Sequence, residues 1–340
     1  MKRQAPEGSS TSGPSRKRAR SLAESYKRVG TIAEGQYGVV FRGELREKAA
    51  PPTATTSSRW VALKQLKLGD VEEGFPVTAL REMAALKSLS HPNVVRLLEV
   101  VVGATMDEVF MVLEHHPHDL KGILTTHGAD AFTPPQIRSL AFGILSGLAY
   151  VHASFLLHRD IKPANLLYGA DGRVLLADFG LVRPYGDPPP DVLSPNVVTL
   201  WYRAPELFFS PETYGPPVDV WSAGAVLVEL LTGSPLANAE SESSYIRKLC
   251  LILGSPSEDS WPGFASLSNA HAHVLPNQTE NYLANRVSDP CGGDQGLIDF
   301  ISSLLTWDPS ARLSANQAAL HPALEESLRT PLSDMPVFPK

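Results

Sequence analysis

Cysteine is scarce in this sequence of 340 residues, which contains only Cys250 and Cys291. Two thiols so far apart cannot form a disulfide framework, and their spacing does not suggest a metal-binding pair. We therefore expect both to remain reduced, as in the cytosol or the nucleus. The N-terminus also lacks the apolar run that characterises a secretion signal.

Charged side chains are absent from residues 139–157, a stretch long enough to raise the hypothesis of a membrane span. Serine, glycine and histidine residues lower its hydrophobicity, and its apolar residues repeat with the spacing of a helix. This pattern predicts a buried helix in a globular protein and no membrane partner.

Charge of either sign is modest, since 19% of the residues are charged and the formal net charge is −6. Such a composition does not fit a wholly disordered chain. The charge is unevenly distributed, because residues 1–20 carry +5 and the other 320 residues carry −11. The acidic body excludes a globally basic nucleic-acid-binding protein, so no direct nucleic acid binding is expected.

The basic N-terminal segment differs in composition from the rest of the chain. Residues 1–25 are rich in Ser, Gly, Pro and Arg and have no apolar periodicity, which predicts a disordered tail. Two basic clusters, Lys2-Arg3 and residues 16–20, resemble a bipartite nuclear import signal. This favours a nuclear protein, with the cytoplasm as an additional location, over the alternative of a solvated basic tail.

The first hundred residues of the body are predicted to be mostly β-sheet. Short β-branched or aromatic runs at 39–41 and 60–63 indicate strands, as do residues 94–102 and 109–113. Residues 76–89 are the exception, since Pro at the start and a helical stripe predict a helix.

After residue 116 the pattern becomes helical. Thr133 and Gln136 form a T-x-x-Q capping box at the start of a helix. Residues 218–231 are apolar on nearly all sides and predict a core helix. The sequence therefore predicts an α+β architecture, with a small β-rich part followed by a larger helical part.

A glycine-rich turn lies between the first two predicted strands. Gly35 and Gly38 would let backbone N–H groups approach a phosphate. By itself this signal is weak, and Ala33 stands where a G-x-G-x-x-G pattern has its first glycine. The sequence contains no Walker-type P-loop, which disfavours a P-loop enzyme.

Lys64 follows three apolar residues in a predicted strand. A lysine buried there would need a carboxylate or phosphate partner. Glu82 is a candidate because it interrupts an otherwise apolar helical stripe. The alternative is a pair of solvent-exposed side chains, as is usual for Lys and Glu.

The strongest chemical signal combines His158-Arg159-Asp160-Ile161-Lys162-Pro163-Ala164-Asn165 with Asp178-Phe179-Gly180. Asp160 could accept the proton of an attacking hydroxyl, and Lys162 could neutralise charge on a transferring phosphoryl group. Asn165 and Asp178 could supply oxygen ligands to Mg²⁺. This combination fits phosphoryl transfer.

These segments together resemble a eukaryotic Ser/Thr protein kinase. The resemblance runs from about Tyr26 to Pro322 and includes Ala204-Pro205-Glu206, residues 219–224 and Arg312, whose family equivalent pairs with that of Glu206. It implies the two-lobed protein kinase fold with ATP between the lobes. We expect a disordered tail at 1–25, an N-lobe with one regulatory helix at 26–115, a helical C-lobe at 116–325 and a C-terminal tail at 326–340.

Within the kinases the chain is similar to the cyclin-dependent family. The similarity rests on residues 74–82, 197–206 and 253–263, which match its cyclin-binding helix, the end of its activation segment and its C-lobe insert. The G-F-P-x-T-A-L-R-E form and residues 214–217 favour the transcription-associated branch over the cell-cycle branch. A cyclin partner is implied.

The resemblance also implies the site residues. Lys64, held by Glu82, would bind the phosphates of ATP once a cyclin brings Glu82 inward, and residues 114–116 would form the hinge against the adenine. The residues expected to bind ATP or its Mg²⁺ are Ala33, Gly35, Gly38, Val40, Lys64, Glu114, His116, Asp119, Asn165 and Asp178.

Control and specificity follow from the same resemblance. Arg81, Arg159 and Arg183 match the positions that gather around a phosphorylated activation-loop residue, here aligned with Ser194. Three clustered guanidinium groups repel one another without an anion, so a phosphate is expected to order the loop. Residues 198–203 would form a pocket for Pro after the target Ser or Thr, as in the Ser-Pro repeats of a polymerase tail.

Three alternatives remain at this point. A cell-cycle kinase of the same family is the first. A pseudokinase scaffold is disfavoured because Lys64, Glu82, Asp160, Asn165 and Asp178 are all present. A cyclin-independent, mitogen-activated type is disfavoured because the activation loop lacks a T-x-Y pair.

Overall fold

The computed structural model describes residues 21–35, 38–47, 59–66, 75–105, 108–186, 199–210, 214–328 and 331–339. The chain forms two compact units. The first comprises the chain up to Leu68 together with Leu98–Leu113, and the second comprises Gly69–Leu97 and Glu114–Lys340.

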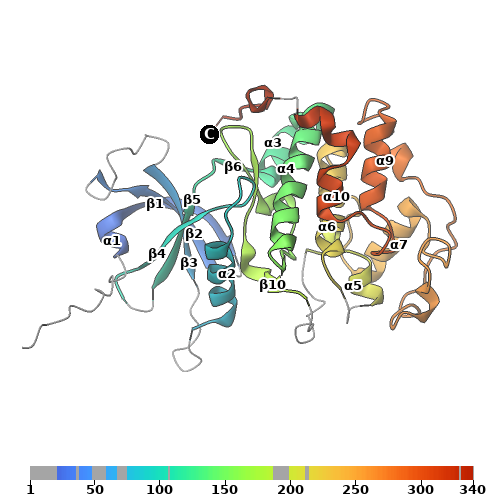
Figure 1. Cartoon of the computed structure of the whole chain (residues 1–340), viewed down its shortest axis with the longest axis horizontal. Helices are drawn as coiled ribbons and strands as arrows, with labels where there is room; N and C mark the ends of the chain where they lie inside the picture. Colours follow the sequence, from blue (N-terminus) through green and yellow to red (C-terminus); the bar gives the residue numbers. More distant parts are fainter. Residues whose placement is uncertain are drawn as a thin grey trace, which may run out of the picture. The chain divides into compact units, whose positions relative to one another are not determined.

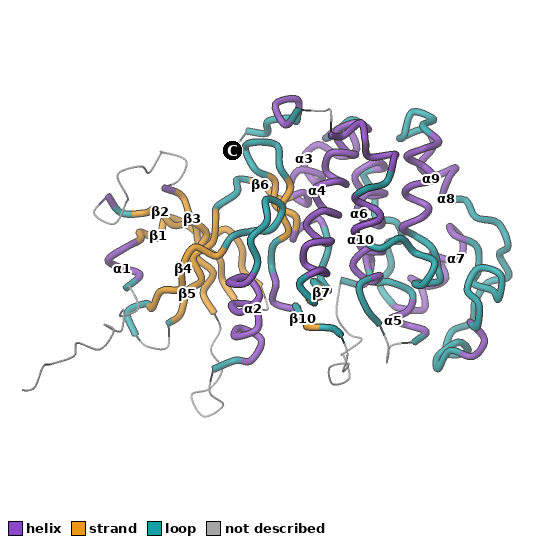
Figure 2. The backbone as a smooth tube through the Cα atoms, in the orientation of Figure 1, coloured by secondary structure: helices purple, strands orange, loops and turns teal. Residues whose placement is uncertain are grey.

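The first unit is built on a five-stranded sheet with the strand order β1-β2-β3-β5-β4. Its strands are blue to teal in Figure 1 and orange in Figure 2. They are β1 Tyr26–Gly35, β2 Gly38–Leu45, β3 Trp60–Leu66, β4 Leu97–Val102 and β5 Val109–Glu114. β2 pairs antiparallel with both β1 and β3. The predicted strands are therefore present, although β4 begins at Leu97 and not at residue 94.

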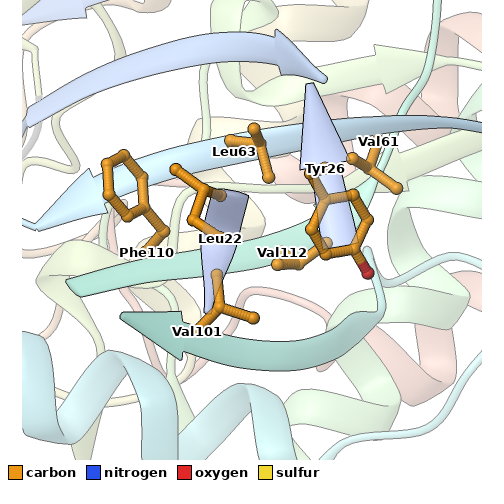
Figure 3. Close-up of a cluster of buried hydrophobic side chains, with 7 residues drawn as sticks. All are labelled: Leu22, Tyr26, Val61, Leu63, Val101, Phe110 and Val112. Atoms are coloured by element: carbon orange, nitrogen blue, oxygen red, sulfur yellow. The ribbon is translucent and has the colours of Figure 1, made fainter. Parts of the chain in front are cut away.

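One face of this sheet carries a buried apolar cluster, shown in Figure 3. The cluster consists of Leu22, Tyr26, Val61, Leu63, Val101, Phe110 and Val112. Leu22 comes from a short helix, α1 Leu22–Ser25, and its side chain is buried in this cluster. Residues 22–25 thus belong to the folded unit, so the prediction of a disordered tail through residue 25 is wrong for them. The rest of that predicted tail, residues 1–20, lies outside the described residues.

The second unit is mainly helical. Its α-helices are α2 Val77–Ser88, α3 Leu120–His127, α4 Pro134–Ala153, α5 Glu206–Phe209, α6 Pro217–Thr232, α7 Glu242–Leu253, α8 Leu283–Ser288, α9 Gln295–Leu304 and α10 Ala315–Ala319. Short 3-10 helices lie between and after them: η4 Gly128–Ala131, η5 Pro163–Asn165, η6 Phe179–Leu181, η7 Leu200–Tyr202, η8 Phe264–Ser266, η9 Pro322–Leu328 and η10 Leu332–Asp334.

Helices α4 and α6 form the centre of this unit, and α4 packs against both α6 and α10 (Figure 1). Residues 218–231 of α6 are all buried, as their apolar pattern predicts. α6 has Pro217 in its first turn and ends at Gly233, whose left-handed backbone (φ 69°) caps it. At the start of α4 the Thr133 N–H donates to Gln136 Oε1 at 2.9 Å, which forms half of the predicted capping box.

Short strands between the helices hold the loops of the second unit. β6 His118–Asp119, β8 Leu166–Tyr168 and β9 Val174–Leu176 form one small sheet. β7 Leu156–Leu157 pairs with β10 Arg183–Pro184 in another.

The predicted regulatory helix, α2, belongs to the second compact unit. α2 contacts η6, and the loop after it is hydrogen-bonded to β9 through Val95 N–H to Leu176 O at 2.9 Å. The expected boundary at residue 115 lies close to the division after Leu113, whereas residues 69–97, which contain α2, group with the second unit.

The uncharged stretch at 139–157 is mostly α4 and its C-terminal turn, with Leu140, Ile144 and Leu148 buried. Within the described parts of the chain, no helix combines the length and apolar character needed to cross a bilayer.

Candidate active site

Asp160 lies at the centre of a group of polar side chains in the second unit. Lys162 Nζ donates to Asp160 Oδ2 at 2.8 Å, and Asn165 Nδ2 donates to the same oxygen at 2.7 Å. Asp160 itself is buried. The loop between β7 and β8 therefore brings the three residues predicted from the sequence into direct contact.

Asn165 is oriented by this contact. Its Nδ2 also donates to the Asp160 carbonyl at 2.9 Å, so both amide hydrogens are directed at one residue. The Oδ1 atom carries no hydrogen, so it can only accept a hydrogen bond or bind a cation. The Ala177 N–H donates to Asn165 O at 2.9 Å, which places Asp178, the next residue, beside this group.

Asp178 has an unusual backbone. Its φ of 59° lies in the left-handed region, which non-glycine residues rarely adopt. The following Phe179 is fully buried and its ring lies 4.7 Å from that of His158. Anchoring of Phe179 holds Asp178 in a conformation that the free chain would avoid.

His158 has a defined protonation state. Its Nε2 lies 3.0 Å from Ala177 O, and its Nδ1 accepts the Asp160 N–H at 3.3 Å. Because a carbonyl only accepts and an amide N–H only donates, the proton is on Nε2 and the ring is neutral. Burial lowers the pKa of His158, although Asp219, Asp160 and Asp178 oppose the shift.

Asp219 anchors the catalytic loop. Its Oδ1 accepts the Arg159 N–H at 2.7 Å, and its Oδ2 accepts the His158 N–H at 2.9 Å and lies 2.9 Å from His152 Nε2. Burial opposes ionisation of Asp219, but the contact with His152 and the backbone N–H groups outweigh it and lower its pKa. These bonds stabilise Arg159 at a φ of 67°.

The sequence assigned no role to Asp219 or His152. Both lie in predicted core helices, and each interrupts an apolar pattern. Asp219 begins the segment 219–224 that matches the kinase family, and it is an acid in the first turn of an apolar helix, but neither signal indicated what it bonds.

The three predicted phosphate-ordering arginines form one electropositive region. Burial and then the charge of Arg81 lower the pKa of Arg183. The Arg159 guanidinium lies 5.7 Å from the centre of the Tyr214 ring, whose pKa is raised by burial against the opposing charges of Arg159 and Arg183. Ser194, the expected phosphorylated residue, lies outside the described residues.

Glu206 and Arg312 form a buried, bidentate ion pair. Arg312 Nη1 and Nη2 donate to Glu206 Oε1 and Oε2 at 2.7 and 3.0 Å. Arg312 also donates to the carbonyls of Thr306 and Pro217. The pairing inferred from the family resemblance is present.

In the first unit, β1 and β2 form a hairpin at the glycine-rich turn. Gly35 pairs with Gly38, Ala33 pairs with Val40, and Val40 also lies opposite Lys64 on β3. Gly38 has φ 145°, and a Cβ there would lie 2.2 Å from Gln65 O. Lys64 is buried. The residues at the tip, Gln36 and Tyr37, lie outside the described residues.

Glu82 is buried on α2, together with Ala79, Ala85 and Leu86. Lys64 belongs to the first unit and Glu82 to the second. Both are buried, which disfavours the alternative of a solvent-exposed pair, but their pairing stays a prediction.

The expected hinge begins with Glu114. Its Oε1 lies 2.7 Å from Arg96 Nε, and its Oε2 lies 3.7 Å from His116 Nε2. The contact with His116 and the charge of Arg96 lower the pKa of Glu114 despite burial. Asp119 caps α3 by accepting the Gly122 N–H at 2.8 Å. The nucleotide-binding role of these residues is a prediction that the contacts do not test.

Comparison with known proteins identifies the family of this site. A family model described as the protein kinase domain matches residues 26–324. The chain is 38% identical to the probable cyclin-dependent kinase 10 of Dictyostelium discoideum, over 93% of this chain and 83% of that protein.

Longer relatives match as well. Cyclin-dependent kinase G-1 of Oryza sativa subsp. indica is 40% identical, and cyclin-dependent kinase 11B of Homo sapiens is 38% identical, each over 93% of this chain. The chain spans 45% and 38% of the lengths of these two proteins.

The sheet-containing first unit and the helical second unit agree with the two-lobed α+β kinase fold. The family match, the identities and the arrangement around Asp160 lead to one conclusion. The chain belongs to the Ser/Thr protein kinases and, within them, to the cyclin-dependent kinases of the transcription-associated branch.

Proposed function

We propose that this kinase transfers the γ-phosphoryl group of ATP to Ser or Thr residues that precede Pro. The observation that carries the proposal is the contact of Asp160 with Lys162 and Asn165 at 2.8 and 2.7 Å. Asp160 accepts the proton of the substrate hydroxyl, and the adjacent ammonium of Lys162 neutralises charge on the transferring group.

Asn165 and Asp178 are the residues that would hold Mg²⁺. The oriented Oδ1 of Asn165 and the Asp178 carboxylate suit a hard cation that takes oxygen ligands. Among the residues that the structure describes, no three His, Cys, Asp or Glu side chains form a metal cage. Two side chains plus phosphate oxygens are the usual set for a nucleotide-bound Mg²⁺. The ion supplies charge neutralisation at the transferring phosphate.

Specificity for proline is proposed from the segment before α5. Three successive carbonyls there accept bonds from the second unit's core: Trp201 O and Arg203 O from Tyr245 Oη at 3.1 Å each, and Tyr202 O from Ser222 Oγ at 2.8 Å. The segment is thus a fixed platform for a substrate backbone. Because these carbonyls are already hydrogen-bonded, a backbone N–H after the target residue would lack an acceptor there. Proline has no such N–H.

A peptide kinase assay tests both parts. Asp178→Asn should lower phosphorylation of a Ser-Pro peptide by about a hundredfold or more, because a charge-stabilising ligand is lost. Asp259→Asn, an exposed site, is the matched control. Unchanged activity of the Asp178 variant would refute the metal assignment, and equal rates on Ser-Pro and Ser-Ala peptides would refute proline selection.

A cyclin is the proposed activating partner. On α2 the apolar side chains of Val77 and Leu80 are exposed, while Ala79 and Leu86 on the other face are buried. An exposed apolar pair on a helix fits a protein contact. Leu80→Glu should abolish co-purification of the cyclin identified by mass spectrometry from nuclear extract, whereas Val274→Glu at a 98% exposed site should not. Identification of a mitotic cyclin would overturn the transcriptional role.

Phosphorylation of Ser194 is proposed to activate the kinase. The repulsion between Arg81 and Arg183 would be relieved by a phosphate between them. Ser194→Ala should prevent activation by any upstream kinase. Full activity of the chain alone, without cyclin and with Ser194 unmodified, would contradict both proposals and favour a cyclin-independent kinase.

A nuclear location and a role in transcription are also proposed, from the basic clusters of residues 1–20 and from the cyclin-dependent relatives. Residues 1–20 fused to a fluorescent protein should concentrate in the nucleus. The same fusion with Lys2, Arg3 and the second cluster changed to Ala should not, and equal distribution of the two fusions would refute the import signal.

A further inference from the structure

The end of the chain, residues 331–339, packs along the second unit, and we call it the C-terminal strap. It comprises η10 and an extended segment from Met335, whose side chain is buried. Tyr168 Oη donates to Pro336 O at 2.8 Å, and His118 Nε2 lies 3.2 Å from Phe338 O. Gln136 Nε2 donates to Asp334 O at 2.9 Å.

Phe338 fixes the end of the strap among aromatic rings. Its ring centre lies 5.0 Å from that of His127, 5.6 Å from those of Phe132 and Tyr168, and 6.1 Å from that of His118. Val337, between the two bonded carbonyls, is 81% exposed. Successive side chains thus point alternately toward the second unit and toward solvent, as in an extended chain bound on one side.

The strands that hold the strap also carry expected nucleotide-site residues. His118 pairs with Tyr168, and the adjacent Asp119 pairs with Leu167. β8 starts directly after Asn165. Asp119 and Asn165 are thus each joined in sequence to a strand that the strap contacts.

The strap also contacts the turn between β8 and β9. Gly172 in this turn has φ 83°, and a Cβ there would lie 2.5 Å from Met335 Cβ and 2.9 Å from Leu332 O. β9 leads to Ala177 and Asp178. The strap therefore contacts β6, β8 and the turn that leads into β9, the elements that contain or adjoin Asp119, Asn165 and Asp178.

We propose that the C-terminal strap positions the nucleotide site, with Phe338 and Tyr168 as positioning residues. The proposal rests on the proposed roles of Asp119, Asn165 and Asp178 toward ATP. Without the strap, β6 and β8 lose two backbone acceptors and an aromatic partner, so the residues they carry become less ordered.

Steady-state kinetics of the full chain with its cyclin test this inference. Phe338→Ala removes all four ring contacts and should raise the KM for ATP by up to about tenfold, because only part of the lost contact energy bears on nucleotide binding. The KM for a Ser-Pro peptide should stay within about twofold, since the platform before α5 is untouched. Val337→Ala, the exposed neighbour, should leave both values unchanged.

Two further measurements keep the test decisive. Tyr168→Phe removes only the hydrogen bond to Pro336 O and should weaken binding of a fluorescent ADP analogue by about three- to tenfold. Phe338→Tyr, which keeps the aromatic ring that Phe338→Ala removes, should bind the ADP analogue with the wild-type affinity. Because this binding measurement needs no peptide substrate, it remains valid even if the proposed proline specificity fails.

If the strap only stabilises the fold and does not position the nucleotide site, these experiments should give a different result. In that case Phe338→Ala and Tyr168→Phe would lower the melting temperature while the affinity for the ADP analogue and both KM values stayed at the wild-type level. That outcome would overturn the proposal.

Discussion

At the scale of single residues, His158 links the catalytic loop to pH. Protonation of Nδ1 would break its bond from the Asp160 N–H, because both ring nitrogens would then be donors. Burial holds the pKa of His158 below its ordinary value of 6.5, and burial does the same for His91. The native state therefore resists protonation of these two rings.

This geometry predicts that the protein loses stability on mild acidification. Below pH 6.5 the unfolded chain binds protons that the native state does not, so the free energy of unfolding rises with pH in this window. The slope contributed by one such histidine is at most about 1.4 kcal/mol per pH unit. Urea unfolding at pH 7.5 and 5.5 measures the difference.

His158→Gln should reduce this pH dependence, since glutamine does not titrate. His271→Gln at an exposed site should leave it intact. If both variants keep the wild-type difference between the two pH values, His158 is not its source.

The roles of single residues could be predicted from the sequence only where the residues that act together lie close together in the chain. Asp160, Lys162 and Asn165 lie within one short loop, so their spacing was enough to predict a shared role in phosphoryl transfer. The bond between His152 and Asp219 joins residues 67 positions apart. Each lies in a helix that the sequence indicated as core, and no local pattern reveals such a pairing.

At the scale of elements, the hairpin of β1 and β2 depends on one glycine. Gly38→Ala should destabilise the hairpin, because a Cβ would collide with Gln65 O at 2.2 Å in a backbone conformation that favours glycine. We expect a loss of about 1–3 kcal/mol in the free energy of unfolding, with a raised KM for ATP. Urea denaturation and ATP titration measure the two effects.

Gly30→Ala provides the matched control on the paired strand, β1. A Cβ at Gly30 meets nothing within 4 Å. If Gly30→Ala and Gly38→Ala behave alike, the close approach of Gly38 to β3 is not important for the hairpin.

Long elements were predictable and short ones were not. α4 and α6 each have Pro in the first turn and more than three turns of apolar periodicity, so their positions follow from the sequence. β6, β7 and β10 contain two residues each, which is too short for any alternation to show. These strands form through tertiary hydrogen bonds, and they hold the catalytic loop and part of the nucleotide site.

At the scale of the whole molecule, Glu206 and Arg312 join segments that are 106 residues apart. Arg312→Met should lower the free energy of unfolding by about 3–5 kcal/mol, because it leaves the Glu206 carboxylate buried without its partner. Chemical denaturation of the full chain measures this loss.

Arg173→Met removes the exposed ion pair with Asp171 and should cost at most about 1 kcal/mol. A similar, small loss for both arginine variants would show that the buried pair contributes no more than a surface one.

Chain order predicted the two-part architecture but not the membership of every element. α2 follows the first three strands in sequence, yet it packs on η6 in the second unit. Similarly, Leu22 belongs to a buried cluster although its neighbours in sequence are polar and basic. Both assignments depend on long-range packing, which composition and periodicity do not contain.

The Asp219 carboxylate binds the backbone N–H groups of the catalytic loop and not the side chains of that loop. The amide hydrogens of His158 and Arg159 are therefore both buried and bonded to an ion in the core helix α6. In heavy water these two amides should exchange only when the second unit unfolds globally, far more slowly than amides of surface turns. The catalytic segment is a loop, but the amide hydrogens of His158 and Arg159 should thus exchange as slowly as those of the core helices.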